Sequence, residues 1–201
     1  MRNWCCEEAP IPYTCMNISK IITIVLAVAA AAFLVLILSD PYFFTSSRKI
    51  QKTGEAKLEE GILGNKAAFR QASHYFSSLI KQGRGNRDTY DLLYWSYRYD
   101  DDHAQAEITM TDALEEYPND VDFLYQRAET RLELQQYAPA ISDYNQVIDI
   151  SKDFPYLPDV YYSRGAAHYK LGQEKEASAD LQHALRTSSD SLQPYPVYFQ
   201  E

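Results

Sequence analysis

Apolar and small residues recur at helical spacing through most of the chain after residue 56, and the segment 160–186 shows this pattern most clearly. Its small residues lie where two helices can touch backbone to backbone: Gly165, Ala166, Ala177 and Ala184. Larger apolar side chains fill the space between them: Tyr161, Tyr169, Leu181 and Leu185. Apolar positions three or four residues apart mark one face of a helix, so this segment predicts an antiparallel pair of helices.

The small residues recur at a nearly fixed interval. Ala72, Ala106 and Ala140 are 34 residues apart, and Ala177 follows Ala140 by 37. A second, apolar series lies four positions after each alanine: Phe76, Met110, Tyr144 and Leu181. The longer last interval coincides with the loop SKDFPYLPD at residues 151–159. This periodicity predicts stacked copies of one helical hairpin.

A 34-residue repeat of paired helices resembles the tetratricopeptide repeat (TPR), whose pattern runs W-x2-L-G-x2-Y, then A-x3-F, then P. The second repeat of this chain has at the corresponding positions Tyr90, Leu93, Tyr94, Tyr97, Ala106, Met110 and Pro118. The third has Leu124, Arg127, Ala128, Arg131, Ala140 and Tyr144, and the fourth has Tyr161, Arg164, Gly165, His168, Ala177 and Leu181. Lys152 and Ser189 stand where the family has proline. The resemblance covers residues 86–187 and implies an all-α fold, an α-α superhelix of three to four TPR-like hairpins.

The N-terminal part of the chain has a different pattern. Residues 21–38 read IITIVLAVAAAAFLVLIL without a charge, and a helix of this length spans roughly 27 Å, close to the thickness of a bilayer core. We therefore expect a single transmembrane helix at 21–38. An uncleaved signal anchor fits better than a signal peptide, whose apolar core is usually shorter. A secreted protein with a cleaved signal peptide is the alternative.

The patterns together divide the chain into five parts. These are a flexible N-terminal tail (1–20), the transmembrane helix (21–38), a juxtamembrane linker (39–55), the TPR-like domain (56–187) and a C-terminal tail (188–201). The predicted helix that opens the domain at Lys57 is short and contains two glycines, which indicates a frayed cap or a half-repeat.

The two ends of the chain leave alternatives open. Both Met1 and Met16 are possible starts, because Met16 closely precedes the apolar segment. At the other end, we expect the tail to fold back over Leu181 and Leu185, or the same surface to meet a second copy of the chain. Repeat arrays need such a cover because their last hairpin has no following repeat.

Basic residues flank the apolar segment on both sides. Arg2 and Lys20 precede it, and a larger group follows it: Arg48, Lys49, Lys52 and Lys57. This count favours a cytoplasmic repeat domain by the positive-inside rule. A short tail with Lys20 next to the apolar segment and Asp40 after it favours the opposite. We expect a single-pass membrane protein with its repeats outside the cytoplasm, in the periplasm of a bacterium.

Net charge excludes one class of partner. The formal net charge of −9 and a pI near 4.9 argue against nucleic acid, because phosphate recognition needs a basic face. All three cysteines, Cys5, Cys6 and Cys15, precede the apolar segment. These cysteines could be lipidation sites, ligands of a metal ion or simply solvated side chains, and the sequence leaves these alternatives open. The repeats contain no cysteine and therefore require no particular redox compartment.

The sequence contains no pattern typical of catalysis. His74, His103, His168 and His183 belong to different predicted helices or faces. Only His168 and His183 could meet across the last hairpin, and two histidines alone make a poor zinc site. The run of aspartates 100–102 before His103 is more typical of a helix cap than of a cation site. Phosphate loops and nucleophile motifs are absent. We expect a protein that is not an enzyme, without metal or cofactor.

The resemblance to TPR proteins implies a binding surface instead. In this family the first helix of each repeat lines a concave groove, which here would contain Asp88, Asp91, Trp95, Arg98, Tyr99, Asp122, Tyr125, Glu129, Glu133, Asp159, Tyr162, Tyr169 and Lys170. Aromatic side chains offer large contact areas, and carboxylates attract lysine or arginine of a ligand. The lysine and asparagine set of the family members that hold chaperone C-termini is missing here.

These observations predict a membrane-anchored adaptor or scaffold. It would bind an extended or helical segment of another protein, with basic or aromatic residues, and serve the assembly or tethering of a membrane complex. The alternative is a structural subunit that self-associates through its last repeat, as a homo-oligomer.

Overall fold

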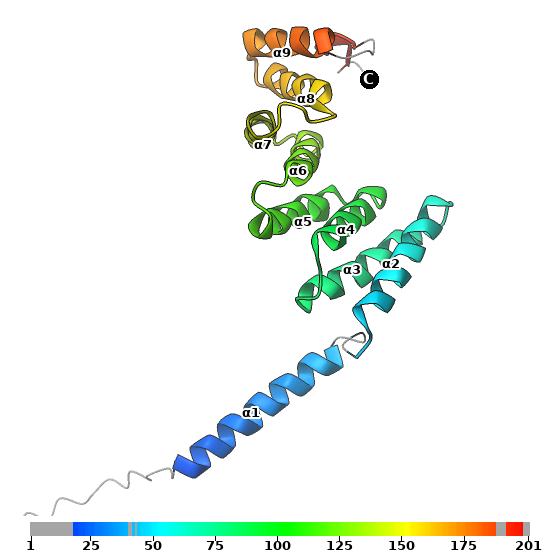
Figure 1. Ribbon diagram of the computed structural model, residues 1–201, viewed down its shortest axis with the longest axis vertical. Helices are drawn as coiled ribbons and strands as arrows, with labels where there is room; N and C mark the ends of the chain where they lie inside the picture. Colours follow the sequence, from blue (N-terminus) through cyan, green and yellow to red (C-terminus); the bar gives the residue numbers. More distant parts are fainter. Residues whose placement is uncertain (1–17, 40–41, 43, 188–191, 199–201) are drawn as a thin grey trace, which may run out of the picture. The chain divides into compact units, whose positions relative to one another are not determined.

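The computed structural model describes residues 18–39, 42, 44–187 and 192–198. Every regular element within these residues is a helix, as predicted (Figure 1). The helices are α1 (Ile18–Ser39), α2 (Ser47–Ile62), α3 (Ala67–Lys81), α4 (Arg87–Tyr99), α5 (His103–Glu116), α6 (Val121–Glu133), α7 (Tyr137–Ile150), α8 (Leu157–Lys170), α9 (Glu174–Thr187) and α10 (Tyr195–Tyr198). The chain divides into two units, Met1–Phe44 and Thr45–Glu201.

The second unit is a row of helical hairpins. Each helix from α2 to α9 packs against the next one along the chain, and the first helices of neighbouring hairpins also touch, α2 with α4 and α6 with α8 (Figure 1). The pairs α2–α3, α4–α5, α6–α7 and α8–α9 form an all-α, TPR-like superhelix, so this part of the predicted fold is confirmed.

The two sequence series form the centre of this array. Ala72, Ala106 and Ala140 are 0% exposed and Ala177 is 2% exposed. In the second series, the side chains that follow the first three alanines are completely buried: Phe76, Met110 and Tyr144. Alanine has no side chain beyond Cβ, so helices can approach closely at these positions while the larger residue one turn later fills the space between hairpins.

The membrane segment predicted from the sequence is not upheld. Residues 21–35, whose side chains are described, are exposed on α1. Across the described part of the chain, no helix is both long and apolar enough to cross a membrane. The predictions of a transmembrane helix or signal anchor at 21–38, and of a single-pass membrane protein with periplasmic repeats, are therefore wrong.

The expectations for the N-terminal tail lie outside the described residues. They concern Cys5, Cys6, Cys15 and the start at Met1 or Met16.

The first hairpin begins earlier than predicted. α2 starts at Ser47, within the stretch expected to be a linker, and runs through Gly54 and Gly61. A Cβ atom at Gly54 would lie 2.8 Å from Cε1 of Phe76, and one at Gly61 would lie 2.4 Å from Cε1 of Phe69. Glycine inside a helix usually weakens it. Here the two glycines let the phenylalanine rings of α3 lie directly on the α2 backbone.

In each of the last two hairpins, a buried aspartate on the second helix binds an arginine on the first. Asp143 on α7 is 1% exposed and accepts two hydrogen bonds from Arg127 on α6, at 2.8 and 2.9 Å. Asp180 on α9 is 5% exposed and accepts two from Arg164 on α8, at 2.6 and 2.8 Å. Two-pronged contacts of this kind fix orientation as well as distance. An arginine–aspartate pair, with its members 16 residues apart in both cases, thus joins the first helix to the second in each hairpin.

The C-terminal segment 192–198 covers the last hairpin. The Tyr195 ring is 3% exposed and its centroid lies 5.2 Å from that of Tyr162 on α8. The Tyr195 hydroxyl donates a hydrogen bond to the Tyr162 carbonyl at 3.1 Å. Leu181 packs in the same apolar cluster, but Leu185 is 47% exposed. The predicted fold-back is therefore confirmed for Leu181 and wrong for Leu185. Self-association through this hairpin stays a prediction.

Replacing Gly165 by alanine is expected to displace Tyr195. A Cβ at Gly165 would lie 2.0 Å from the Tyr195 hydroxyl oxygen and 2.9 Å from Cβ of Asp180, so neither side can accommodate it without movement. We expect the free energy of unfolding to fall by about 1–3 kcal/mol. Chemical denaturation measures the loss, and limited chymotrypsin digestion with mass spectrometry measures faster cleavage after Leu192 and Tyr198, the sites on either side of Tyr195 that proline does not block.

The Tyr195→Ala background serves as the control for this substitution. With the ring gone, Gly165→Ala should cost clearly less than in the wild type, because only the Asp180 contact remains. An equal cost in both backgrounds would mean that Tyr195 does not rest on Gly165 in solution.

Candidate functional site

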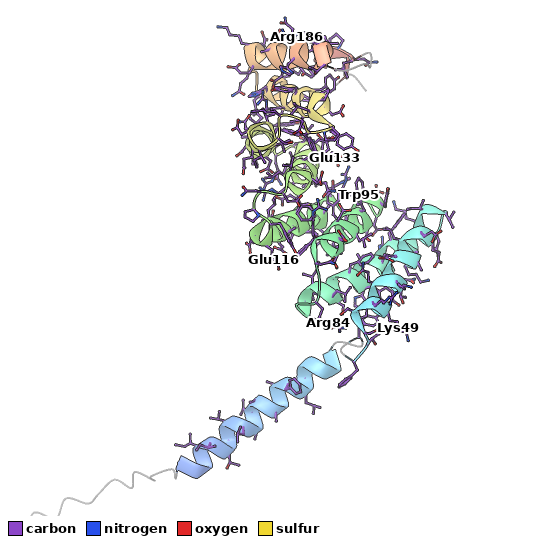
Figure 2. All side chains as sticks on the ribbon, viewed as in Figure 1. Lys49, Arg84, Trp95, Glu116, Glu133 and Arg186 are labelled. Carbon is purple, nitrogen blue, oxygen red and sulfur yellow. The ribbon has the colours of Figure 1, made fainter. Side chains whose placement is uncertain are left out.

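A pocket of about 540 Å³ opens between α4, α6 and the loop that precedes α8. We call it the α4–α6 pocket; it is lined by Arg87, Asp91, Tyr94, Trp95, Arg98, Asp122, Tyr125, Gln126, Glu129 and Tyr156. Figure 2 labels Trp95, which lines the pocket from α4, and Glu133 at the end of α6. The pocket thus lies on the first helices of the second and third hairpins, where the resemblance to TPR proteins places the groove.

Helix caps and one arginine set how α4 lies against α6. Asn86 caps α4 by accepting a hydrogen bond from the Thr89 backbone N–H at 3.0 Å, and Asp120 caps α6 by accepting one from that of Phe123 at 3.1 Å. Arg87, the first residue of α4, donates to Asp120 at 2.6 and 3.1 Å and to Asp122 at 2.6 Å. The first turns of α4 and α6 are therefore joined, because the Arg87 guanidinium on α4 binds two carboxylates at the start of α6.

Aromatic rings form two walls of the pocket. On the α4 side, Trp95 stacks on Tyr99 with ring centroids 5.7 Å apart. On the α6 side, Tyr125 lies parallel to Tyr156 at 5.9 Å and meets Phe154 edge-on at 5.5 Å. Phe154 and Tyr156 come from the loop that makes the last sequence interval three residues longer. The extra residues thus contribute to the second wall.

Positive charge in the pocket is already paired. Arg98 donates to Glu133, with Nη2 and Oε1 2.7 Å apart, and its other terminal nitrogen lies 2.6 Å from Nδ1 of His103. Arg87 is held by Asp120 and Asp122, as described above. Both arginines that line the pocket therefore have carboxylate partners, and one of these, Asp122, lines the pocket as well.

Two carboxylates of the pocket have neutral partners instead. Asp91 accepts a hydrogen bond from Nε2 of Gln126 at 2.7 Å, and Glu129 accepts one from the Tyr144 hydroxyl at 2.6 Å. Neither carboxylate forms an ion pair within the residues that the structure describes. The side-chain oxygen of Gln126 is buried without a hydrogen-bond partner. The pocket therefore carries excess negative charge and an unused acceptor.

Burial shifts the proton equilibria of the pocket. It raises the pKa of the Glu129 carboxyl, and the negative charges of Glu133 and Asp159 act in the same direction. It also raises the pKa of the Tyr125 hydroxyl, with a further contribution from Glu129. Tyr125 therefore keeps its proton at neutral pH, and a cation entering the pocket would favour the ionised form of Glu129.

The structure brings together six of the thirteen groove residues expected from the sequence. Those that line the pocket are Asp91, Trp95, Arg98, Asp122, Tyr125 and Glu129, whereas Asp88, Tyr99, Glu133, Asp159, Tyr162, Tyr169 and Lys170 do not. Tyr99 is 45% exposed and extends the Trp95 wall. Tyr162 instead donates a hydrogen bond to the Gln193 carbonyl of the C-terminal segment at 2.9 Å.

Four pocket residues were not expected: Arg87, Tyr94, Gln126 and Tyr156. Tyr94 appeared in the sequence only as a repeat position, and Tyr156 lies in a loop between repeats. The helical period gives no signal for a loop residue.

The histidines do not converge. His183 stacks on Tyr161 with ring centroids 3.7 Å apart, and His168 faces Gln173. Within the described ranges, no group of histidine, cysteine and acidic side chains could hold a metal ion.

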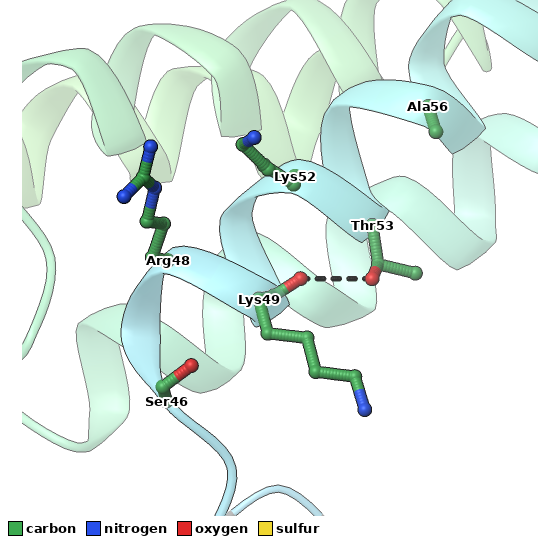
Figure 3. A pocket seen from close by; sticks show the side chains of 6 residues that line it. All are labelled: Ser46, Arg48, Lys49, Lys52, Thr53 and Ala56. Carbon is green, nitrogen blue, oxygen red and sulfur yellow. Dashed lines mark hydrogen bonds between the residues drawn. The ribbon is translucent and has the colours of Figure 1, made fainter.

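A second hollow, of about 450 Å³, lies at the beginning of α2 (Figure 3). It is lined by Ser46, Arg48, Lys49, Lys52, Thr53 and Ala56. The Thr53 hydroxyl donates to the Lys49 carbonyl at 2.8 Å, which is a contact within the helix. In Figure 3, Arg48 and Lys52 extend from one side of α2 and Lys49 from the other. The cations therefore do not point at a common ligand position.

Comparison with known proteins agrees with this architecture. The sequence model of the tetratricopeptide repeat matches residues 121–154 and 158–191, which contain α6–α7 and α8–α9. One solved structure, titled "Crystal structure of MamA", shares 18% sequence identity at a TM-score of 0.60, over 87% of this chain and 95% of that one. Another, "Crystal structure of MamA protein", shares 18% at a TM-score of 0.60, over 88% and 93%. Residues 121–154 and 158–191 are therefore tetratricopeptide repeats, within a fold similar to that of MamA.

Proposed function

We propose that this chain is a non-enzymatic adaptor that binds a segment of another protein along the inner helices α4 and α6. The α4–α6 pocket is the observation that carries the proposal. It combines aromatic walls with carboxylates that lack a cation partner within the described residues. Such a combination suits recognition of a polypeptide, because large rings supply contact area and charged groups select the partner.

The aromatic side chains around the pocket are available to a partner. Trp95 is 37% exposed, Tyr99 45% and Tyr156 54%. Aromatic rings of this size are usually more deeply buried in folded domains. Because tryptophan and tyrosine dominate the energetics of many protein interfaces, these three are the expected main contributors to affinity.

Selection from a random-peptide display library tests the proposal. The full chain would be the target, and recovered peptides would be measured against the variant Trp95→Ala/Tyr156→Ala. We expect their affinity to fall at least about tenfold, because each ring supplies part of the contact area. Circular dichroism would confirm that the variant keeps its helices.

A matched control removes equally exposed apolar side chains from the second helices. Ile108 on α5 is 47% exposed and Ile150 on α7 is 45% exposed. The variant Ile108→Ala/Ile150→Ala should leave peptide affinity unchanged. Recovered peptides that bind the wild type and both double variants equally would place the binding surface elsewhere and overturn the proposal.

A further inference from the structure

We propose that the α4–α6 pocket receives an arginine side chain of the bound segment, with its guanidinium between the aromatic walls and against Asp91, Gln126 and Glu129. This inference rests on the proposed function and names the chemistry that the same site recognises. Three independent features of the pocket support it.

The first feature is unbalanced charge. Arg87 and Arg98 are already paired with Asp120, Asp122 and Glu133. Asp91 and Glu129 are left with hydrogen bonds from an amide and a hydroxyl, which are neutral donors. A partially buried carboxylate without a cation is unfavourable in the free protein. A cationic ligand would supply the missing charge, whereas an anionic ligand would increase the excess.

The second feature is the arrangement of acceptors. Asp91 and Gln126 are bonded to each other across α4 and α6, and the Gln126 oxygen has no donor although it is buried. Asp91, Gln126 and Glu129 all line the same pocket, so acceptors come from both helices. A guanidinium presents five N–H donors in one plane and can serve several acceptors at once, whereas an ammonium group is a compact point charge. The geometry therefore favours arginine over lysine.

The third feature is the aromatic lining. A guanidinium binds favourably over an aromatic ring within about 6 Å of its centroid. The protein already uses this contact twice: Arg87 lies 4.9 Å from the Phe123 ring and Arg164 lies 5.2 Å from the Tyr161 ring. Trp95 and Tyr125 provide ring surfaces on opposite helices of the pocket. Pockets of about 300–1,000 Å³ hold small ligands, so about 540 Å³ is ample for one side chain.

Short synthetic peptides test the inference directly. The probes are acetyl-Ala-Arg-Ala-amide and its citrulline counterpart, which has nearly the same shape without the charge. Binding to the full chain is followed by the NMR signal of the Trp95 indole N–H, assigned with Trp95→Phe. We expect the arginine peptide to bind about tenfold or more tightly than the citrulline peptide, because only it forms charge-assisted hydrogen bonds. The lysine counterpart should lie between the two.

Asp91→Asn provides the decisive variant, and Asp88→Asn its control. Both residues lie on α4, but only Asp91 lines the pocket. Asp91→Asn should remove most of the preference for arginine over citrulline, and Asp88→Asn should preserve it. Equal affinity for the two peptides, no Trp95 shift with the arginine peptide, or a preference unchanged in Asp91→Asn would each overturn the inference.

These outcomes are distinguishable from failure of the proposed function. Library peptides that depend on Trp95 and Tyr156 but show no arginine preference would preserve the adaptor and eliminate the arginine site. A library that yields no peptide dependent on these rings would eliminate the adaptor itself.

Discussion

Replacing Asp143 by asparagine is expected to lower the free energy of unfolding by about 3–5 kcal/mol, because it leaves the buried Arg127 without its counter-charge and removes one of the two carboxylates that pair with Arg131. Asp143 accepts hydrogen bonds from Arg127 and from Arg131, the latter at 2.8 Å. The side chains of these arginines are only 14% and 16% exposed. Arg131 also contacts Glu107, so the group joins α5, α6 and α7. Urea denaturation followed by circular dichroism measures the loss.

Asp149→Asn is the matched control on the same helix. The Asp149 side chain is 82% exposed, and its contact with Lys152 is 3.8 Å long. Exposed pairs of this kind contribute little, so the control should unfold as the wild type does. A loss below about 1 kcal/mol for Asp143→Asn would contradict the assignment of a buried network.

Replacing Phe76 by alanine is expected to lower the free energy of unfolding by about 3–5 kcal/mol. A completely buried ring is then removed from the first hairpin. Phe76 packs with Phe69, Leu58 and Leu93, and thereby connects α2, α3 and α4. A frayed first repeat would tolerate the change. Hydrogen exchange across α2 and α3 would show whether this hairpin loses protection with the loss of the ring.

Gly54→Ala gives an internal control for the same contact. In the wild type its Cβ would lie 2.8 Å from the Phe76 ring, so we expect destabilisation by about 1–3 kcal/mol. In the Phe76→Ala background that clash is absent, and the better helix propensity of alanine contributes about 0.5–1 kcal/mol in the opposite direction. The cost should therefore fall by at least about 1 kcal/mol. Strict additivity of the two changes would show that α2 does not pack on Phe76.

The repeat architecture could be predicted because it depends on a few crowded positions. Ala72, Ala106 and Ala140 must be small for helices to touch, and the large residue one turn later must fill the gap. Such constraints leave a fixed interval in the sequence, which survives even though several repeat positions differ from the family pattern. The all-α array could therefore be predicted from alanine spacing and a resemblance together.

The membrane prediction failed because it rested on a marginal length. A span needs about 17–25 apolar residues, and residues 21–38 lie at the lower end of that range. Within the part of the chain that the structure describes, no helix combines the length and the apolar character that a membrane span needs.

The pocket could be predicted only in part. Asp91, Trp95 and Tyr125 follow from their register on first helices, but the contribution of Tyr156 depends on the path of a loop. The buried aspartates carried a signal that remained unused: Asp143 and Asp180 each lie three residues after a register alanine. Pairing with Arg127 and Arg164 becomes visible only when two helices are placed side by side.

The segment that carries Phe154 and Tyr156 connects α7 to α8, and its length has an evolutionary consequence. Insertions and deletions are tolerated in connecting segments far better than inside packed helices. Shortening this loop to restore a uniform period would take away one side of the α4–α6 pocket, because Tyr156 lines it. New partner preferences could therefore arise by indels between repeats, without any change to the stacked scaffold.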